Sequence, residues 1–215
     1  MGWYDMNEKF SITSLPILET NRLFLLPWKL EYAEDMLLFA SNENVVIPGG
    51  WKLITDVKKA KNRIKRYMAG SEEWAIALKS EDGFKIIGSI GMRTTAAFKE
   101  YNLCKALGYV LAEEYWGQGL CSEALQELIK YSFFSSKCDA ITVSHNVFNS
   151  RSRRVIEKCQ FKLRGIYPKS RPDDPYSKAC YIMTFDDFEN SYDDSIWDYT
   201  LQLITNSPIL YPNNK

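Results

Sequence analysis

The stretch Trp116-Gly-Gln-Gly119 lies between a strand-like run, "ALGYVLA", and a helix-like run that begins near Leu120. Glycines at such a turn let the backbone approach a ligand closely, because they carry no Cβ. The first amides of the following helix have no intrahelical acceptor and, together with the helix dipole, favour an anion. A diphosphate is the anion that we expect at this turn. A tight turn with a positive φ at Gly117 or Gly119 explains the glycines equally well.

Two common phosphate-binding motifs do not fit this turn. A dinucleotide-binding fingerprint needs a third glycine where this chain has Ser122, and an acid at the far end of the next strand, whereas Asp139 precedes that strand. A nucleoside-triphosphate loop needs Gly-Lys-Ser/Thr, which is missing. The remaining interpretation is a nucleotide diphosphate attached to a group that lies along the preceding strand.

The cysteines and the single histidine are the other reactive side chains. Five cysteines, an odd number without Cys-x-x-Cys spacing, favour buried, reduced thiols over a disulfide framework, a zinc site or a catalytic thiol. No metal site is predicted. His145 ends a strand-like run near the expected cleft, and its ordinary pKa suits proton transfer, but a lone histidine is more often structural.

The elements that position these residues follow from the hydrophobic periodicity. The chain gives the order strand, two helices, three strands, helix, strand, helix and two strands, without an internal repeat. The pair Asp82-Gly83 predicts a hairpin between two of the strands. This order predicts one mixed α/β sheet of about seven strands with helices on both faces.

Composition limits the partners. The 27 Lys and Arg residues balance the 27 Asp and Glu residues, so no net charge favours nucleic acid, and the basic run between Asp56 and Met68 is interpreted as a solvated helix face. The N-terminus lacks the apolar core of a signal peptide, and no early apolar run approaches the roughly 20 residues of a membrane span. The sequence therefore predicts a cytoplasmic protein without a membrane or nucleic-acid partner.

The last thirty residues differ in composition from the rest. The first half of the segment after Phe185 contains six acidic residues and no basic residue. Its aromatic residues predict docking as an appended helix rather than a free acidic tail. The predicted organisation is an N-terminal extension (1–17), one folded domain (18–185) and an acidic, aromatic appendage (186–215).

Ordered motifs across the predicted domain resemble one enzyme family. They include Gly108-Tyr109, Trp116 to Gly119, Glu123-Ala124, Asn149 with Ser152, and Glu157-Lys158 followed by Phe161. This order resembles the GNAT superfamily of N-acetyltransferases, within it the group of ribosomal-protein-alanine N-acetyltransferases, over roughly Leu18 to Thr184. The resemblance implies the GNAT fold, a mixed sheet whose central strands splay apart, and accounts for the position of the turn in mid-chain.

The resemblance also implies an acetyl-CoA site. The pyrophosphate would bind the amides of Trp116, Gly117, Gln118, Gly119 and Leu120. The pantetheine arm would run along Tyr109, Val110 and Leu111, on a strand that splays away from "AITVSH". Asn149 and Ser152 would face this arm, and as a helix N-cap Asn149 would also contribute about 1 kcal/mol.

Catalysis needs an oxyanion donor, a proton for the departing thiolate and a proton acceptor for the amine. The backbone N–H near Leu111 fits the first role. Many members of the superfamily use a Tyr of the last helix for the second, but this chain has Ile156 there, so Ser152, one turn earlier, is the predicted donor, with a simple capping role as the alternative.

No proton acceptor stands out. The related group often carries an acid where this chain has Ala106, which leaves His145 and the strand-flanking carboxylates Glu72, Glu73, Glu113 and Glu114 as candidates. A second departure is Gln160 in place of a glycine, which predicts a strained left-handed residue, at about 1 kcal/mol, or a different helix end.

The function implied by the resemblance is direct acetyl transfer from acetyl-CoA to a primary amine, with a peptide N-terminus favoured over a small molecule, by a monomer or homodimer. The alternative is a CoA-binding regulatory module with lost or weak catalysis that acts through a protein partner. The missing Tyr and Ala106 favour the alternative, whereas the intact turn and Ser152 favour the enzyme.

Overall fold

The computed structural model describes residues 15–168 and 176–191 of the chain. One sheet of eight strands runs through these residues in the order β1-β2-β3-β4-β5-β6-β8-β7. All neighbouring pairs are antiparallel except β5 and β6, which are parallel. The strands are β1 (Leu18–Glu19), β2 (Leu23–Pro27), β3 (Glu72–Ser80), β4 (Gly83–Thr94), β5 (Cys104–Leu111), β6 (Ala140–Asn146), β7 (Lys162–Tyr167) and β8 (Lys178–Thr184).

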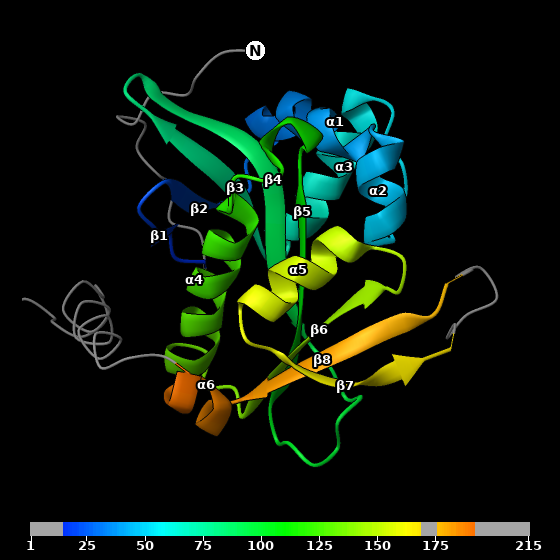
Figure 1. Cartoon of the computed structure of the whole chain (residues 1–215). Coiled ribbons are helices and arrows are strands. Elements are labelled where there is room, and N and C mark those ends of the chain that lie inside the picture. The colour runs from blue at the N-terminus through cyan, green and yellow to red at the C-terminus, as the bar shows by residue number, and fades with distance from the viewer. Residues whose placement is uncertain (1–14, 169–175, 192–215) are drawn as a thin grey trace, which may run out of the picture.

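The helices cover both faces of this sheet (Figure 1). One face carries the helices that precede β3, and the other carries α4 and α5, as the buried residues of each helix show. A short last helix packs at the end of α4. The helices are α1 (Ala33–Ala40), α2 (Glu43–Gly49), α3 (Val57–Met68), α4 (Leu120–Phe134), α5 (Ser150–Lys158) and α6 (Phe185–Ser191), with 3-10 turns at Leu30–Tyr32 and Glu113–Tyr115.

Alternation along β3 shows how the sheet separates two apolar cores. Trp74 and Ile76 pack into the core beneath α4 and α5, whereas Ala75 and Ala77 pack into the core beneath α1 and α3. Successive side chains of a strand point to opposite faces, so each strand of the middle of the sheet contributes to both cores. Both layers are therefore needed to hold the central strands in place.

The parallel pair at the centre of the sheet separates partway along its length. β5 pairs with β6 only from Cys104 to Leu107, opposite Ala140 to Val143, while β4 stays paired with β5 as far as Leu111. The second half of β5 therefore has an edge that faces a gap instead of a strand. The mixed sheet with helices on both faces and a splayed middle is confirmed.

Two details of the structure differ from the sequence prediction. The sheet has eight strands rather than about seven, because the two residues of β1 add an edge strand to β2. Three helices rather than two precede β3: the additional helix, α2, begins after Asn42, whose side chain accepts a hydrogen bond from the Asn44 amide, and contains Pro48. Proline late in a seven-residue helix obscured the periodicity that would have revealed it.

The segments on either side of the predicted domain lie only partly within the described residues. The aromatic appendage begins as α6, in which Phe188 is fully buried against Phe133 and Phe134. Its remainder after Ser191, and the extension before Leu15, lie outside the described residues. The proposed boundaries at 17 and 185 stay predictions. Within the described ranges, no helix has the length and apolar character to cross a membrane.

Candidate functional site

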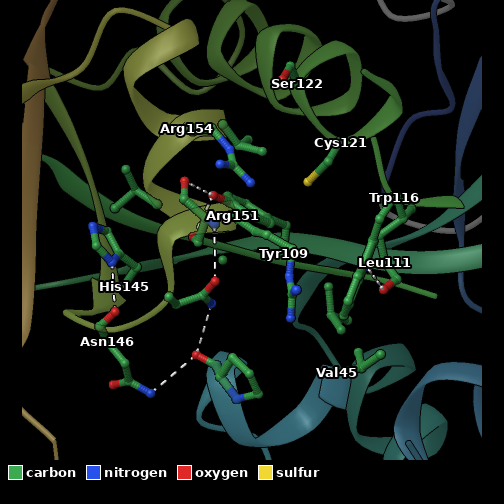
Figure 2. Close-up of a pocket in the computed structure, with 18 of the residues that line it drawn as sticks. Val45, Tyr109, Leu111, Trp116, Cys121, Ser122, His145, Asn146, Arg151 and Arg154 are labelled. Carbon is green, nitrogen blue, oxygen red and sulfur yellow. Dashed lines mark hydrogen bonds between the residues drawn. The ribbon is translucent and has the colours of Figure 1, made fainter. Parts of the chain in front are cut away.

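The gap between β5 and β6 opens into a cavity of about 800 Å³. Residues of β5 and β6, the glycine turn, and helices α2, α4 and α5 line it. Figure 2 shows Val45 of α2 on one side of this cavity and Cys121 of α4 on the other, with Arg151 and Arg154 of α5 beside it. The cavity therefore reaches from the α4 and α5 face of the sheet to the α2 face.

The glycine turn has the geometry of an anion site. Gly117 and Gly119 both have left-handed φ values, 76° and 77°, which favour glycine. Gly119 is the N-cap of α4 without a side-chain cap, and the first α4 hydrogen bond at this end runs from the Glu123 amide to the Gly119 carbonyl. The amides at the start of α4, from Leu120 to Ser122, therefore have no acceptor within the helix.

Cationic side chains surround this turn. Arg22 donates to the Gln118 carbonyl over 3.0 Å and pairs with Glu123 of α4, which fixes its guanidinium beside Gly119. Lys158 approaches Gly119 from α5, and Arg151 lies 4.1 Å from the centre of the Trp116 ring. Sequence reasoning missed these residues because Arg22 lies almost a hundred positions from the turn, and helix charges rarely indicate a site by themselves.

The free edge of β5 presents backbone groups to the cavity. The Ala112 amide donates to Ile87 of β4, and backbone groups alternate sides along a strand, so those of Tyr109 and Leu111 face the gap. The Leu111 carbonyl accepts from the Trp116 indole over 2.9 Å, while no strand of the described part of the chain pairs with the Leu111 amide on this side. This edge offers donors and an acceptor to an extended ligand.

Asn149, at the N-terminus of α5, makes two structural hydrogen bonds with its side chain. Its side-chain oxygen accepts from the Ser152 amide over 3.1 Å, which is the predicted N-cap, and its side-chain nitrogen donates to the Pro48 carbonyl of α2 over 3.2 Å. Asn146 donates to the same carbonyl. The two contacts with Pro48 tie α2 to β6 and to the start of α5 across the cavity.

Ser152 and Tyr109 form a hydroxyl pair. The Ser152 Oγ lies 2.8 Å from the Tyr109 hydroxyl, and both residues line the cavity. Burial raises the pKa of Tyr109 well above its ordinary value, so the phenol keeps its proton at neutral pH. Ile156, at the position where many superfamily members have a tyrosine, is fully buried in the core and does not line the cavity. Sequence reasoning placed Tyr109 beside the pantetheine arm but missed the role of its hydroxyl.

His145 lines the cavity, but its ring is fixed by its neighbours. Nδ1 lies 2.8 Å from the Asn146 carbonyl oxygen, the ring packs against Tyr181, and only 5% of the residue is exposed. Nε2 is buried without a hydrogen-bond partner among the described residues. Because successive side chains of β6 point to opposite faces of the sheet, His145 lies on the α4 and α5 face, with Ile141 and Val143.

The four strand-flanking carboxylates have different surroundings. Glu72 pairs with Lys105, Glu113 accepts from Asn42 and Asn44, and Glu114 lies 3.6 Å from Lys85. Glu73 instead accepts a hydrogen bond from the Ser89 hydroxyl over 2.5 Å. Burial raises the pKa of Glu73 to about 7, although Ser89, Arg63 and Arg93 oppose this shift.

The thiols are not arranged for nucleophilic chemistry. All five cysteines are free, and burial raises the pKa of Cys104, Cys121, Cys138 and Cys159. A thiol with a raised pKa is a weak nucleophile at neutral pH. In the described part of the chain, no group of three or more His, Cys, Asp or Glu side chains is placed to hold a metal ion.

The structure brings the predicted site residues together around this cavity. The candidate carboxylates Glu72, Glu73, Glu113 and Glu114 do not line it, and of the other residues predicted from the sequence only Gln118 is absent from the lining. The others line it: Tyr109, Val110, Leu111, Trp116, Gly117, Gly119, Leu120, His145, Asn149 and Ser152.

Comparison with known proteins agrees with this geometry. The family model described as an acetyltransferase (GNAT) domain matches residues 22–162. The chain is 27% identical over 156 residues to the uncharacterised N-acetyltransferase YoaA of Bacillus subtilis (strain 168), covering 70% of this chain and 85% of that protein.

Solved structures share the fold. A GNAT-family acetyltransferase from Bacillus anthracis superposes with a TM-score of 0.69 at 22% identity, covering 79% of this chain and 98% of the other. The RimL ribosomal L7/L12 α-N-protein acetyltransferase in complex with coenzyme A gives a TM-score of 0.65 at 16% identity, covering 80% and 99%. Since the family model covers well over half of the chain, this protein belongs to the GNAT family of N-acetyltransferases.

Proposed function

We propose that this enzyme transfers the acetyl group of acetyl-CoA to a primary amine by direct attack, and that it prefers the α-amine of a peptide N-terminus to a lysine side chain. The observation that carries the proposal is the cavity in the β5/β6 gap, which joins an anion-binding turn, a free strand edge and a hydroxyl pair.

The turn is assigned to the phosphates of CoA. Pyrophosphate carries negative charge close to the backbone, and the glycines leave space for it: a Cβ on Gly117 would meet nothing within 4 Å. The amides at the start of α4 supply donors, and Arg22, Arg151 and Lys158 supply positive charge. A helix N-terminus joined to cationic side chains is a general solution for binding phosphate.

The free edge of β5 is assigned to the pantetheine arm. Its amide groups need partners in an extended arrangement, which the backbone groups of Tyr109 and Leu111 offer. The Leu111 amide then lies where it can stabilise the negative charge that develops on the thioester oxygen.

The hydroxyl pair is assigned to the departing sulfur. When the C–S bond breaks, the sulfur keeps the electron pair and needs a proton. Ser152 is the proposed donor, with Tyr109 behind it as the proton reservoir, because the two hydroxyls share a hydrogen bond and the buried phenol holds its proton. His145 stays a weaker candidate for proton transfer, since its Nδ1 is held by the Asn146 carbonyl.

Amine basicity supports the preference for α-amines. An α-amino group has a pKa of about 7.7–8.0 and is about one-tenth neutral at pH 7, whereas a lysine at about 10.4 is neutral in only about one molecule in 2,500. Deprotonating the lysine requires about 3.5 kcal/mol more. The RimL neighbour is named as an α-N-protein acetyltransferase, which agrees with this preference, although that likeness extends to the fold alone.

Mass spectrometry of a panel of amines incubated with enzyme and acetyl-CoA tests the proposal. The panel contains peptides with free N-termini, N-terminally blocked copies that carry a lysine, polyamines and aminoglycosides. We expect acetylated product, with a higher kcat/KM at pH 7 for free N-termini than for lysines of the blocked copies. Equal or faster lysine acetylation would contradict the α-amine preference.

A further inference from the structure

The carboxylate of Glu73 occupies space that a side chain on the neighbouring strand would fill. Glu73 of β3 pairs with Gly91 of β4, and Gly91 pairs with Gly108 of β5. A Cβ on Gly91 would lie 2.1 Å from the Glu73 Oε2. The absence of that Cβ lets Glu73 reach across β4 towards β5.

This direction leads to the cavity. Residues paired across strands point to the same face, so the row of Glu73, Gly91 and Gly108 faces the α2 side of the sheet. Gly108 lines the cavity, and a Cβ there would meet nothing within 4 Å. Cross-strand neighbours have Cβ positions about 4.5–5.5 Å apart, so the carboxylate over Gly91 lies about one strand spacing from the space above Gly108. One water molecule bridges such a distance.

The charged and polar groups around Glu73 come from two elements. α3 contributes Arg63 and Tyr67, and β4 contributes Ser89 and Arg93. Arg93 lines the cavity, and Arg63 lies 5.3 Å from the ring centre of Trp51, which also lines it. The carboxylate therefore belongs to a polar cluster that borders the cavity on the face opposite α4 and α5.

We propose that Glu73 is the general base of the reaction and accepts a proton from the attacking amine across the gap left by Gly91 and Gly108. This inference rests on the proposed function. It places the acceptor amine on the α2 side of the sheet and the departing sulfur beside Tyr109 and Ser152 on the other side.

The proton balance is complete with these groups. The ammonium gives one proton to Glu73, which returns it to solvent, and the neutral nitrogen attacks the thioester carbon. The N–C bond forms and the C–S bond breaks. The sulfur takes a proton from the Tyr109–Ser152 pair. The attacking nitrogen loses its second proton to solvent, and solvent returns one proton to the hydroxyl pair. The sum is an ammonium and a thioester converted to an amide, a thiol and one free proton.

The environment suits this role at neutral pH. A general base works best when its pKa lies near the working pH, and burial raises the pKa of Glu73 to about 7. That value is within about one unit of an α-ammonium but more than three units below a lysine ammonium. The same carboxylate therefore gives a physical reason for the preference for α-amines.

The test compares Glu73→Gln with Glu72→Gln, using the amine that the wild type acetylates fastest in the panel. Glu72 is the adjacent carboxylate on the opposite face, paired with Lys105, so its variant controls for charge removal in the same strand. We expect kcat/KM of Glu73→Gln to fall by about 100-fold to 10,000-fold at pH 7, with unchanged affinity for acetyl-CoA. The deficit should shrink as the pH rises towards the pKa of the amine, because the amine then deprotonates unaided.

Ser89→Ala supplies a second readout that a purely structural carboxylate would not give. The Ser89 hydroxyl donates to the carboxylate and lowers its pKa, so its loss should move the acidic limb of the kcat/KM profile to a higher pH. A folded Glu73→Gln variant within about threefold of wild type, or a deficit that is the same at every pH, would overturn the assignment of Glu73 alone. A wild type that acetylates no amine of the panel would refute the proposed function itself, and the assignment with it.

Discussion

At the scale of single residues, we propose that the hydroxyl pair takes the role of the tyrosine that α5 lacks at Ile156. Ser152 and Tyr109 come from α5 and β5, and their oxygens are 2.8 Å apart in the cavity. Ser152 was expected as the proton donor from its place one turn before Ile156. Tyr109 was expected only for its backbone groups beside the pantetheine arm, because the sequence does not show where the side chain of a strand residue points.

The first prediction concerns this pair. Ser152→Ala and Tyr109→Phe should each lower kcat by about 100-fold to 10,000-fold, because each removes part of the path that protonates the thiolate. The two losses should not add in the double variant, since both residues act in one step. Steady-state kinetics measure the losses, and calorimetric titration with acetyl-CoA should show unchanged affinity. A loss below about threefold in both single variants would point to water or another group.

The sequence alone does not distinguish the carboxylate that we propose as the base, and it does not identify the cations at the turn. The sequence offered four carboxylates as equal candidates for the base, and only the register of three strands distinguishes Glu73 from them. The hairpin turn sets the register of β3 on β4 only as far as the shift between Ile76 and Ala77, and the register of β4 on β5 depends on pairing between strands that no short turn joins. The cations at the turn, Arg22 above all, are likewise brought there by tertiary structure.

At the scale of elements, the turn between β5 and α4 was the most predictable part of the site. Its glycines, the strand before it and the helix after it are contiguous in the chain, so local rules suffice. α2 was missed because it is short and contains Pro48. The separation of β5 from β6 was expected only from the resemblance to a family, because pairing that stops in mid-strand leaves no signal in the strand's own residues.

The second prediction concerns the turn. Gly119→Ala should weaken binding of CoA at least about tenfold, or about 1.4 kcal/mol, because a Cβ narrows the approach of phosphate to the backbone. Gly70→Ala is the control: Gly70 also has a positive φ, 119°, and does not line the cavity. Both variants should lose some stability, but only the first should lose affinity by calorimetric titration. Undiminished affinity of a folded Gly119→Ala variant would refute the assignment of the turn to the pyrophosphate.

The third prediction concerns the end of α5. Gln160 has a φ of 63°, so the expected strained left-handed residue is present where the related group has glycine. Gln160→Gly should therefore stabilise the protein by about 1 kcal/mol in denaturant unfolding. Glu157→Gly, inside the same helix, should instead destabilise it by about 1 kcal/mol. A loss of stability in Gln160→Gly would show that its contact with the Ser191 carbonyl outweighs the strain.

At the scale of the whole molecule, the proposed catalytic groups lie on both faces of the sheet. The α4 and α5 face carries the glycine turn, the cations and the hydroxyl pair, and the α2 face carries Glu73 and Arg93. The cavity in the β5/β6 gap joins the faces, so cofactor and amine can meet at the centre of the sheet. This arrangement favours an enzyme over a CoA-binding module, because a module that only binds CoA needs no polar cluster on the second face.

The most direct test of this account measures the release of free CoA from acetyl-CoA with and without an amine, by the appearance of its thiol. An acetyltransferase that uses the joined cavity should release CoA at a rate that rises with amine concentration and saturates, with one acetylated amine formed for each thiol. Tight binding of acetyl-CoA with thiol release that is the same with and without every amine would contradict the account and favour the regulatory module.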